Sequence, residues 1–414
     1  MSRRVVVTGM GILCPIAKTI DDYWKALVNG HNGVGYITHF DTTEFDVKFA
    51  AEIKDFDYSD WMDRKEARKM DDFTKYGLIA AELAVKDSEI DFEKVDGTRA
   101  GVITGSGIGG METFEKEYRT LFEKGPRRIS PFFIPMMIPD ITPGRISIKF
   151  GCKGPNYSTI SACASASHAI GNAFREIQIG AADIMISGGS EATITPMGIA
   201  GFTNMKALST RNDDPEHASR PFDKERDGFI VGEGGGMLVL ESEEHARKRG
   251  ARIYAELFGI GFSADAYHIT APVPDGSGAA QSMLTAIDEG GITTNEIDYI
   301  NAHGTSTPYN DKTETQAIKK AFGDRAADIP ISSTKSMIGH LLGASGGAEL
   351  IATILCINHN IVHPTINYEV VDPECDLNYT PNIAMEKEIN FALSNSFGFG
   401  GHNASILIGK YREK

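Results

Sequence analysis

Short apolar runs alternate along the chain with longer segments in which apolar residues recur at helical spacing. Residues 5–7, 102–104 and 184–186 are short β-prone runs, the pattern of buried strands. Residues 73–85 carry apolar positions three and four apart, which predicts an amphipathic helix. Residues 164–179 form another predicted helix, whose many small side chains indicate burial on most faces. Strands that alternate with helices in this way predict an α/β fold with covered sheets.

The same rhythm continues through the second half of the chain. We expect strands at 253–262, 299–302, 329–333, 391–396 and 404–408, and helices at 279–289, 313–322 and 341–357. Two similar α/β halves are therefore predicted, one at 1–250 and the other at 251–414. Because the sequence similarity between the two halves is weak, this prediction depends on the order of their elements.

The charge balance is acidic and excludes some classes of partner. There are 41 Lys and Arg residues against 56 Asp and Glu, a formal net charge of −15, which argues against nucleic acid or an anionic membrane as a partner. No apolar run approaches the ~20 residues of a membrane span. The N-terminus runs directly into a strand without a signal-peptide cleavage region. Five cysteines without a C-x-x-C pair are typical of a reduced compartment, so we expect a cytoplasmic protein.

One glycine run has the form of a dinucleotide-binding motif. Residues 105–110, G-S-G-I-G-G, satisfy G-x-G-x-x-G and follow a predicted strand. That motif also requires a second strand, ending in an acidic residue, about 20 residues further on. Residues 111–124 instead continue as a charged helix, and a loop follows. The run is therefore interpreted as a tight turn between a strand and a helix.

Cys163 lies in S-A-C-A-S-A, between a β-prone segment and the small-residue helix. This is an elbow that brings the thiol to a helix N-terminus, where unpaired amides and the helix dipole favour a thiolate and lower the pKa. Small neighbours would let a substrate approach the sulfur closely. A buried structural cysteine remains an equally open interpretation at this point.

Two histidines also follow predicted strands. His303, in N-A-H-G-T-S-T, stands at the carboxyl end of a strand, where α/β proteins build ligand sites; a loop histidine bonded to backbone is the alternative. His340, in K-S-M-I-G-H, begins a helix, and that position favours a neutral imidazole that donates N–H. Lys335 and Glu349 flank His340 and are expected to form a buried ion pair behind it, because the neighbours of Glu349 are small or apolar.

The C-terminal glycine loop adds a fourth motif, N-S-F-G-F-G-G-H-N at 395–403. Alternating phenylalanine and glycine predicts either a flexible gate over a pocket or a turn that fills the core. A zinc site is a further hypothesis, with ligands from Cys163, His303, His340 and His402. We consider it unlikely on sequence grounds, because the ligands are single, far apart and without an H-E-x-x-H or C-x-x-C nucleus.

Taken in order, the four motifs resemble those of the β-ketoacyl-[acyl-carrier-protein] synthases, condensing enzymes of fatty acid synthesis. The resemblance extends from V-V-V-T-G-M-G near the N-terminus to G-F-G-G-H-N near the C-terminus. Two histidines beside the cysteine are similar to type I and type II synthases, and G-S-G-I-G-G is most similar to type II. The resemblance implies the thiolase fold, with two α/β halves in a layered αβαβα core. The first half would carry the cysteine and the second half both histidines.

The resemblance also implies roles for the residues of the four motifs. Cys163 would take the acyl chain from acyl carrier protein as a thioester, with its own N–H and that of Phe399 forming the oxyanion hole. His303 and His340 would stabilise the enolate formed when malonyl-carrier protein loses carbon dioxide. Lys335 and Glu349 would position the two histidines and tune them electrostatically. Phe399 would also act as the gate over the pocket.

Substrate and partner positions are carried over in the same way. The resemblance implies contacts to the phosphopantetheine arm from Thr270, Thr305 and Thr307, and an acyl pocket built from Ile108, Phe133 and Phe202, with Phe133 supplied by the partner subunit of a homodimer. Carrier protein is itself acidic, so a local basic patch is expected on this acidic chain. Its candidate residues are Lys65, Arg68, Lys69, Arg127, Arg128 and Lys206. No metal and no separate cofactor are implied, because the substrates are carried on the phosphopantetheine of acyl carrier protein.

Some departures and alternatives remain. Residues 136–143, M-M-I-P-D-I-T-P, are unusual where the pocket and dimer interface are expected, so chain-length preference stays open. His402 stands where threonine is also common in the family. A type I synthase remains an alternative. A non-catalytic chain-length partner would lack the cysteine, and a thiolase would need a second cysteine in the glycine loop, where Cys356 and Cys375 do not lie. A dinucleotide oxidoreductase is the most distant alternative.

Overall fold

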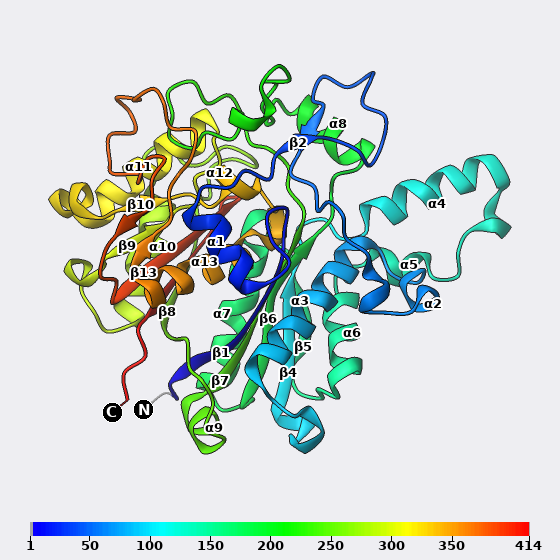
Figure 1. Ribbon diagram of the computed structural model, residues 1–414, viewed down its shortest axis with the longest axis horizontal. Helices are drawn as coiled ribbons and strands as arrows, with labels where there is room; N and C mark the ends of the chain where they lie inside the picture. The colour runs from blue at the N-terminus through cyan, green and yellow to red at the C-terminus, as the bar shows by residue number, and fades with distance from the viewer. Residues whose placement is uncertain (1–2, 414) are drawn as a thin grey trace.

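One long mixed sheet organises the molecule (Figure 1). The computed structural model describes residues 3–413, and its ten-stranded sheet has the order β10-β9-β13-β14-β8-β1-β7-β6-β4-β5. The N-terminal half contributes β1 (Val5–Leu13), β4 (Ala100–Gly105), β5 (Asn156–Thr159), β6 (Ile184–Glu191) and β7 (Gly234–Ser242). The C-terminal half contributes β8 (Ala255–Ala264), β9 (Tyr299–Asn301), β10 (Ile331–Ser332), β13 (Phe391–Gly398) and β14 (His402–Gly409).

The two halves of the sheet have the same topology. From the outer edge inward, each half places its third, second, fourth, fifth and first strand side by side. In each half the three outer strands are parallel and the two inner pairings are antiparallel. The halves join where Val5–Val7 of β1 pair with Ala255–Leu257 of β8. The predicted α/β fold of two similar halves is therefore confirmed, whereas the boundary at residue 250 remains a prediction.

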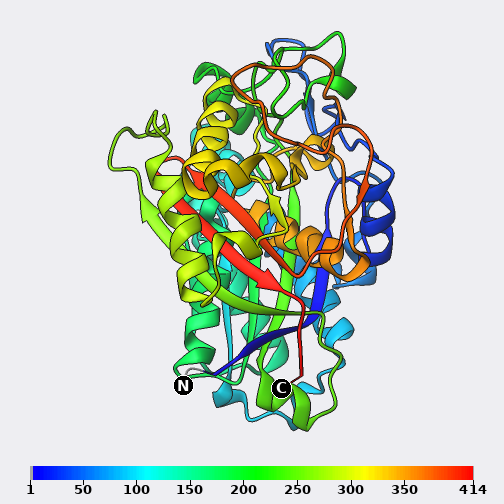
Figure 2. The same ribbon diagram turned by 90° about the vertical axis from the view of Figure 1, so that its left-hand side faces the viewer.

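Helices cover both faces of each half and fill the space between the halves. On the outside, α3 (Asp72–Ser88) packs on β1 and β7, and α10 (Ser277–Glu289) packs on β8 and β14. Between the halves, α7 (Ser165–Gln178) and α13 (Ser345–His359) each contact strands of both. Figure 2 shows the C-terminal half from its own side, with the red β13–β14 hairpin beside its helices. These layers are the αβαβα arrangement that the resemblance implies.

Close approach of helix to sheet explains several strand glycines. A Cβ on Gly11 of β1 would lie 2.0 Å from the carbonyl oxygen of Ala80 in α3. A Cβ on Gly236 of β7 would lie 2.5 Å from the amide nitrogen of Ala348 in α13. Both separations are far below van der Waals contact, so only glycine lets these helices lie against the sheet.

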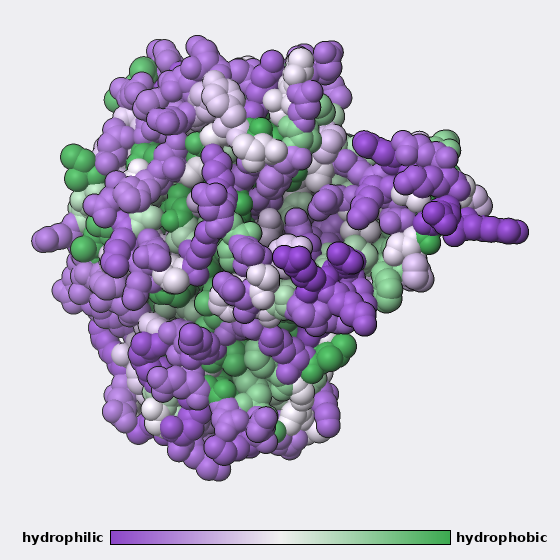
Figure 3. Space-filling model, turned by 45° about the vertical axis from the view of Figure 1, so that its right-hand side comes forward, coloured by the Kyte–Doolittle hydropathy of each residue, from purple (hydrophilic) through white to green (hydrophobic). Residues whose placement is uncertain are grey.

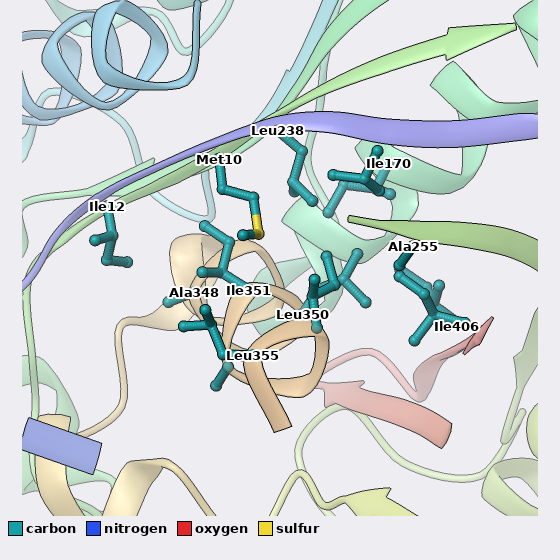
Figure 4. Close-up of a cluster of buried hydrophobic side chains, with 14 of the residues drawn as sticks. Met10, Ile12, Ile170, Leu238, Ala255, Ala348, Leu350, Ile351, Leu355 and Ile406 are labelled. Atoms are coloured by element: carbon teal, nitrogen blue, oxygen red, sulfur yellow. The ribbon is translucent and has the colours of Figure 1, made fainter. Parts of the chain in front are cut away.

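The largest core cluster belongs to both halves (Figure 4). Met10 and Leu238 of the N-terminal strands meet Leu350 and Ile351 of α13, with Ile406 of β14 on the other side. Every residue of α13 from Ser345 to Ile357 is buried, as the small and apolar composition of that segment predicts. The helix that follows His340 is thus part of the largest buried cluster.

The remaining helices include segments predicted from the sequence, at 111–124 and 313–322, and others that were not predicted. They are α1 (Ile20–Val28), α2 (Arg64–Ala67), α4 (Met111–Lys124), α5 (Phe133–Met137), α6 (Ile141–Phe150), α8 (Pro196–Asn204), α9 (Glu243–Lys248), α11 (Pro308–Phe322) and α12 (Lys335–Ile338). Two small sheets pair β2 (Gly35–Tyr36) with β3 (Phe49–Ala50) and β11 (Ile361–Val362) with β12 (Met385–Glu386). Across residues 3–413, no helix is both long enough and apolar enough to cross a membrane.

Candidate active site

Two similar elbows face each other at the centre of the molecule. Ala162 has φ 50°, and the chain then turns through Cys163 into α7. In the second half Leu342 has φ 48°, and the chain turns through Gly343 into α13. The left-handed residue makes each turn sharp enough to bring the next residue to the helix N-terminus. Cysteine occupies that place in the first elbow and glycine occupies it in the second.

His340 lies just before the second elbow and contacts the cysteine. Its Nε2 is 3.0 Å from Sγ of Cys163. Its Nδ1 accepts a hydrogen bond from the backbone N–H of Leu342 at 3.2 Å and lies 2.9 Å from Oγ of Ser345. Because a backbone N–H can only donate, the neutral ring carries its proton on Nε2, facing the sulfur. Burial, followed by the charge of Lys335, lowers the pKa of His340 well below its usual value, so the ring is neutral as expected.

His303 follows the end of β9 and lies beside His340. The backbone N–H groups of His303 and Gly304 donate to the two carboxylate oxygens of Glu314, each at 2.8 Å, and this holds the turn. The ring lies 5.3 Å from that of His340, nearly perpendicular to it, and is 2% exposed. Burial, Lys335 and His340 lower its pKa well below the usual value. Within residues 3–413, its Nδ1 has no hydrogen-bond partner.

The predicted ion pair between Lys335 and Glu349 is present. Nζ of Lys335, at the start of α12, donates to Oε1 of Glu349 in α13, and both side chains are almost fully buried. The charge of Lys335 lowers the pKa of both histidines and opposes the effect of burial on Cys163. Its ammonium group therefore keeps the two imidazoles neutral and attracts negative charge that develops beside them.

The thiol of Cys163 does not follow the expectation of a lowered pKa. Burial raises the pKa of Cys163 to about 12, and the charge of Lys335 and a hydrogen bond from the backbone N–H of Phe399 only partly offset this. The side chain is removed from water, which disfavours a thiolate more strongly than the helix N-terminus favours one. The resting group is a thiol with an N–H donor from Phe399 directed at its sulfur.

A cavity of about 460 Å³ opens at these side chains. Cys163, His303 and His340 lie on its wall, and Gly398 and Phe399 of the glycine loop border it. Most of the predicted substrate positions line the same cavity, and one predicted docking residue borders it: Ile108, Phe202, Thr270, Thr305, Thr307 and Lys206.

Other predicted positions lie outside this cavity. Phe133 is in α5, which follows α4 in the chain. Helix α4 projects from the body as an arm (Figures 1 and 3). Lys65, Arg68 and Lys69 lie on or directly after α2; Lys65 and Arg68 are exposed, and Lys69 bonds to Glu66. Arg127 and Arg128 are exposed just after the arm.

The ligands considered for zinc come together only in part. One ligand atom from each of Cys163, His303 and His340 lies within 4.8 Å of the others, although the residues are far apart in the sequence. His402 is exposed and packs near His168, at 6.4 Å between ring centroids. Nε2 of His340 carries the proton, so this ring presents a hydrogen-bond donor to the sulfur rather than a metal ligand.

The glycine motif at 105–110 binds a carboxylate of the protein itself. Glu191, fully buried at the end of β6, accepts hydrogen bonds from the N–H groups of Gly107 and Ile108 at 2.6 and 3.2 Å. Ser106 and Gly109 donate to it as well. This confirms that the run is a turn. The sequence analysis did not identify Glu191, because the amide donors that bind it lie far away in the sequence.

A duplicated α/β fold with a cysteine at one elbow and two neutral histidines beside it defines a thiolase-fold condensing enzyme. The chain belongs to the β-ketoacyl synthase family. The models of its N-terminal and C-terminal domains match residues 2–246 and 254–369. It is accordingly an acyltransferase of the condensing type.

Individual relatives agree with this assignment. The chain is 52% identical over 410 residues to a 3-oxoacyl-[acyl-carrier-protein] synthase 2 of Synechocystis, covering 99% of both proteins. It superimposes on a β-ketoacyl synthase of Burkholderia phymatum with a TM-score of 0.92 at 38% identity, covering 99% of this chain and 100% of that one. A type II polyketide ketosynthase, solved in complex with its acyl-carrier protein, gives a TM-score of 0.91 at 35% identity, with both chains covered completely.

Proposed function

We propose that this chain is a 3-oxoacyl-[acyl-carrier-protein] synthase that elongates acyl chains by two carbons in fatty acid synthesis. The observation that carries this is the convergence of Cys163, His303 and His340 at one wall of a single cavity, with ligand atoms within 4.8 Å of one another. The name of the Synechocystis relative, 52% identical over the whole chain, supports the same reaction.

In the first half-reaction, Sγ of Cys163 attacks the carbonyl carbon of an acyl thioester on carrier protein. A new thioester forms at Cys163, and the phosphopantetheine sulfur leaves with the proton that the thiol gives up. The N–H groups of Cys163 and Phe399 stabilise the oxyanion. The N–H of Phe399 already points at the sulfur, and this supports its place in the oxyanion hole.

In the second half-reaction, malonyl-carrier protein binds in the same cavity and loses carbon dioxide. Negative charge then develops on its thioester oxygen, where His303 and the Nε2–H of His340 donate hydrogen bonds. The carbanion attacks the acyl thioester and forms a carbon–carbon bond, and the bond from the acyl carbon to Sγ breaks. Lys335, paired with Glu349, keeps both rings neutral and ready to donate.

We further propose that acyl carrier protein delivers both substrates. Thr270, Thr305 and Thr307 at the cavity would bind the phosphopantetheine arm, and the arm would carry the substrates so that no separate cofactor is needed. The polyketide neighbour, solved with its own acyl-carrier protein, supports such a partner. The docking surface would use positive side chains near the cavity mouth and around α2: Lys65, Arg68, Lys69, Arg127, Arg128 and Lys206.

A homodimer is part of the proposal. β5 is one of the two outer strands of the sheet, and Tyr157 within it and Ile160 directly after it are 38% and 63% exposed. An unprotected edge with apolar side chains is suited to pairing with another chain. Phe133 would then reach the acyl pocket of the partner.

We also propose a cytoplasmic location, which the five free cysteines support. The boundary between the two halves is proposed at residue 250.

A non-catalytic chain-length subunit is the other function of this fold that we weighed. Cys163 at the elbow, with His340 3.0 Å from its sulfur, favours a catalyst over such a subunit. Type I and type II synthases share this arrangement, and we propose type II.

Intact-protein mass spectrometry tests the nucleophile. After incubation with a saturated acyl-carrier protein, we expect the wild-type chain to gain the mass of one acyl group. The gain should disappear in Cys163→Ala and persist in Cys152→Ala, a control at another buried cysteine. An adduct that survives in Cys163→Ala would remove Cys163 from the mechanism.

A further inference from the structure

Glu191 joins the turn at residues 105–110 to the second elbow. Its Oε2 accepts the N–H of Gly107 at 2.6 Å and the N–H of Gly343 at 3.0 Å. Its Oε1 accepts the N–H of Ile108 at 3.2 Å and the hydroxyl of Ser106 at 3.0 Å. One carboxylate therefore binds a loop of the N-terminal half and the turn that follows His340 in the C-terminal half.

The strand register explains why the carboxylate lies there. β4 and β6 are parallel, with Gly105 opposite Gly189, so their carboxyl ends meet at one edge of the sheet. The turn at residues 105–110 follows the end of β4, and Glu191 is the last residue of the neighbouring strand β6. The second elbow is also in direct contact with this turn, since a Cβ on Gly343 would lie 2.1 Å from the amide nitrogen of Gly107.

The buried group is held as an anion. Four of its partners are backbone N–H groups, which can only donate. Burial raises the pKa of Glu191 above its usual value, and these hydrogen bonds oppose that rise. A carboxylate that accepts several N–H bonds is well stabilised, whereas a neutral carboxyl group would leave some of these donors without an acceptor.

The two segments that Glu191 joins both contribute side chains to the cavity. Ile108 from the turn at residues 105–110 and Leu342 from the second elbow line the cavity. Both belong to one apolar cluster with Phe202 and Phe229. The N–H of Ile108 itself, and that of Gly343 directly after Leu342, are the groups that the carboxylate binds. One side chain is therefore bonded to both of these walls of the cavity.

We infer that Glu191 is a positioning residue that sets the separation of Ile108 and Leu342, and through it the acyl chains that the cavity accepts. The effect on acyl chains rests on the proposed function, whereas the positioning of Ile108 and Leu342 by Glu191 does not. A second effect follows from the charge, because a buried anion near Cys163 opposes ionisation of the thiol.

Two variants separate these effects. Glu191→Gln keeps the shape but turns an NH₂ group toward N–H donors and removes the charge. Glu191→Asp keeps the charge and shortens the reach by one methylene. Glu52→Gln is the matched control, because Glu52 is another buried carboxylate that accepts backbone N–H bonds, from Thr38 and His39, and it does not line the cavity.

The first measurement is kcat/KM for a series of acyl-carrier proteins of increasing chain length. We expect Glu191→Gln and Glu191→Asp each to change the ratio between the best and the poorer acyl chains by about 10- to 100-fold, as misplacement by about 1 Å can do. Glu52→Gln should keep the wild-type ratio. A uniform fall across all chain lengths in both variants would overturn the inference, since it would indicate general damage to the site.

The second measurement needs no substrate, so it stands even if the proposed reaction is wrong. The pH profile for alkylation of Cys163 by iodoacetamide should move to lower pH in Glu191→Gln and stay in place in Glu191→Asp. Unchanged profiles in both, together with unchanged acyl preference, would show that Glu191 neither positions nor tunes the site. If the wild-type chain condenses no acyl substrate but the profile moves as expected, only the proposed function fails.

Discussion

A single proton on His340 determines what the histidine can do. Nδ1 is occupied by the backbone N–H of Leu342, so Nε2 carries the proton and cannot take one from Cys163. The ring of His340 can therefore donate a hydrogen bond to negative charge, and we propose that it does so rather than act as a base. His303, whose ring is equally buried and neutral, is suited to the same task.

Replacing His303 by alanine tests that task. His303→Ala removes one of two N–H donors to the enolate, so decarboxylation of malonyl-carrier protein should fall by about 10²- to 10³-fold. Acylation of Cys163 should continue, because the sulfur and the N–H of Phe399 are untouched. His217→Ala, at an exposed surface histidine, is the control. Decarboxylation at the wild-type rate in His303→Ala would show that its assigned role is wrong.

The pH dependence of thiol reactivity tests the burial of Cys163. With its pKa raised to about 12, the thiolate is a small fraction near neutral pH and grows as pH rises. Alkylation by iodoacetamide, followed by mass and compared with Cys163→Ser, should accelerate about tenfold per pH unit between pH 6 and 9. A plateau within this range would mean that the helix N-terminus dominates and that the pKa is lowered instead.

At this scale the motif residues could be predicted and Glu191 could not. Cys163, His303 and His340 each stand beside small residues and glycine, so the local sequence reports a special turn. Gly188, Gly189 and Ser190 precede Glu191 as well, but its role depends on donors that lie 82 to 152 positions away in the sequence. The raised pKa of Cys163 was missed for a related reason, since burial depends on the whole fold.

The two elbows are the elements that assemble the site. Each consists of a left-handed residue followed by a helix that packs between the halves, and the two elbows lie against each other. The second elbow also meets the turn at residues 105–110, where Gly343 contacts Gly107. Since the helices are buried on most sides, the turns that precede them have little freedom. The geometry of the catalytic residues is therefore a consequence of helix packing rather than of loop sequence alone.

A methyl group at the contact between Gly343 and Gly107 tests whether helix packing determines the geometry of the site. In Gly343→Ala the new Cβ would lie 2.1 Å from the nitrogen of Gly107 and 2.7 Å from Oε2 of Glu191. We expect a loss of about 1–3 kcal/mol in the free energy of unfolding, measured by denaturant titration, and loss of acylation. Gly144→Ala in α6, whose Cβ meets no atom within 4 Å, should instead be stabilising by about 0.5–1 kcal/mol. Equal stability of the two variants would contradict the account.

Sequence periodicity was most informative for long elements. The predicted helices at 73–85 and 341–357 correspond to α3 and α13, and the hairpin near the C-terminus corresponds to β13 and β14. Short strands were harder to delimit: the segment predicted at 329–333 is a strand only at Ile331–Ser332. In such strands the pairing partner, rather than the local pattern, decides where the element ends.

At the scale of the whole molecule, charge has to be local to be useful. The chain carries a net charge of −15, and a carrier protein that is also acidic would be repelled by an even distribution. Exposed Lys65 and Arg68 lie together at α2, and Lys69 packs its ammonium 5.7 Å from the ring of Phe132. Exposed positive side chains are thus available at α2.

Charge reversal tests this surface. Lys65→Glu combined with Lys69→Glu should weaken carrier-protein binding, measured by titration calorimetry, and added salt should weaken the wild-type complex in the same direction. Lys25→Glu combined with Lys248→Glu makes the same change in net charge at α1 and α9. If both pairs weaken binding equally, net charge rather than a docking patch governs the interaction.

The central claim is that Cys163 and the two histidines join an acyl chain to a decarboxylated malonyl unit. The most direct test isolates the enzyme acylated at Cys163, mixes it with malonyl-carrier protein and measures both intact masses. The account predicts carrier protein bearing a 3-oxoacyl chain two carbons longer than the acyl group, together with deacylated enzyme. Release of the unextended fatty acid, or an acyl-enzyme that persists beside unchanged malonyl-carrier protein, would contradict it.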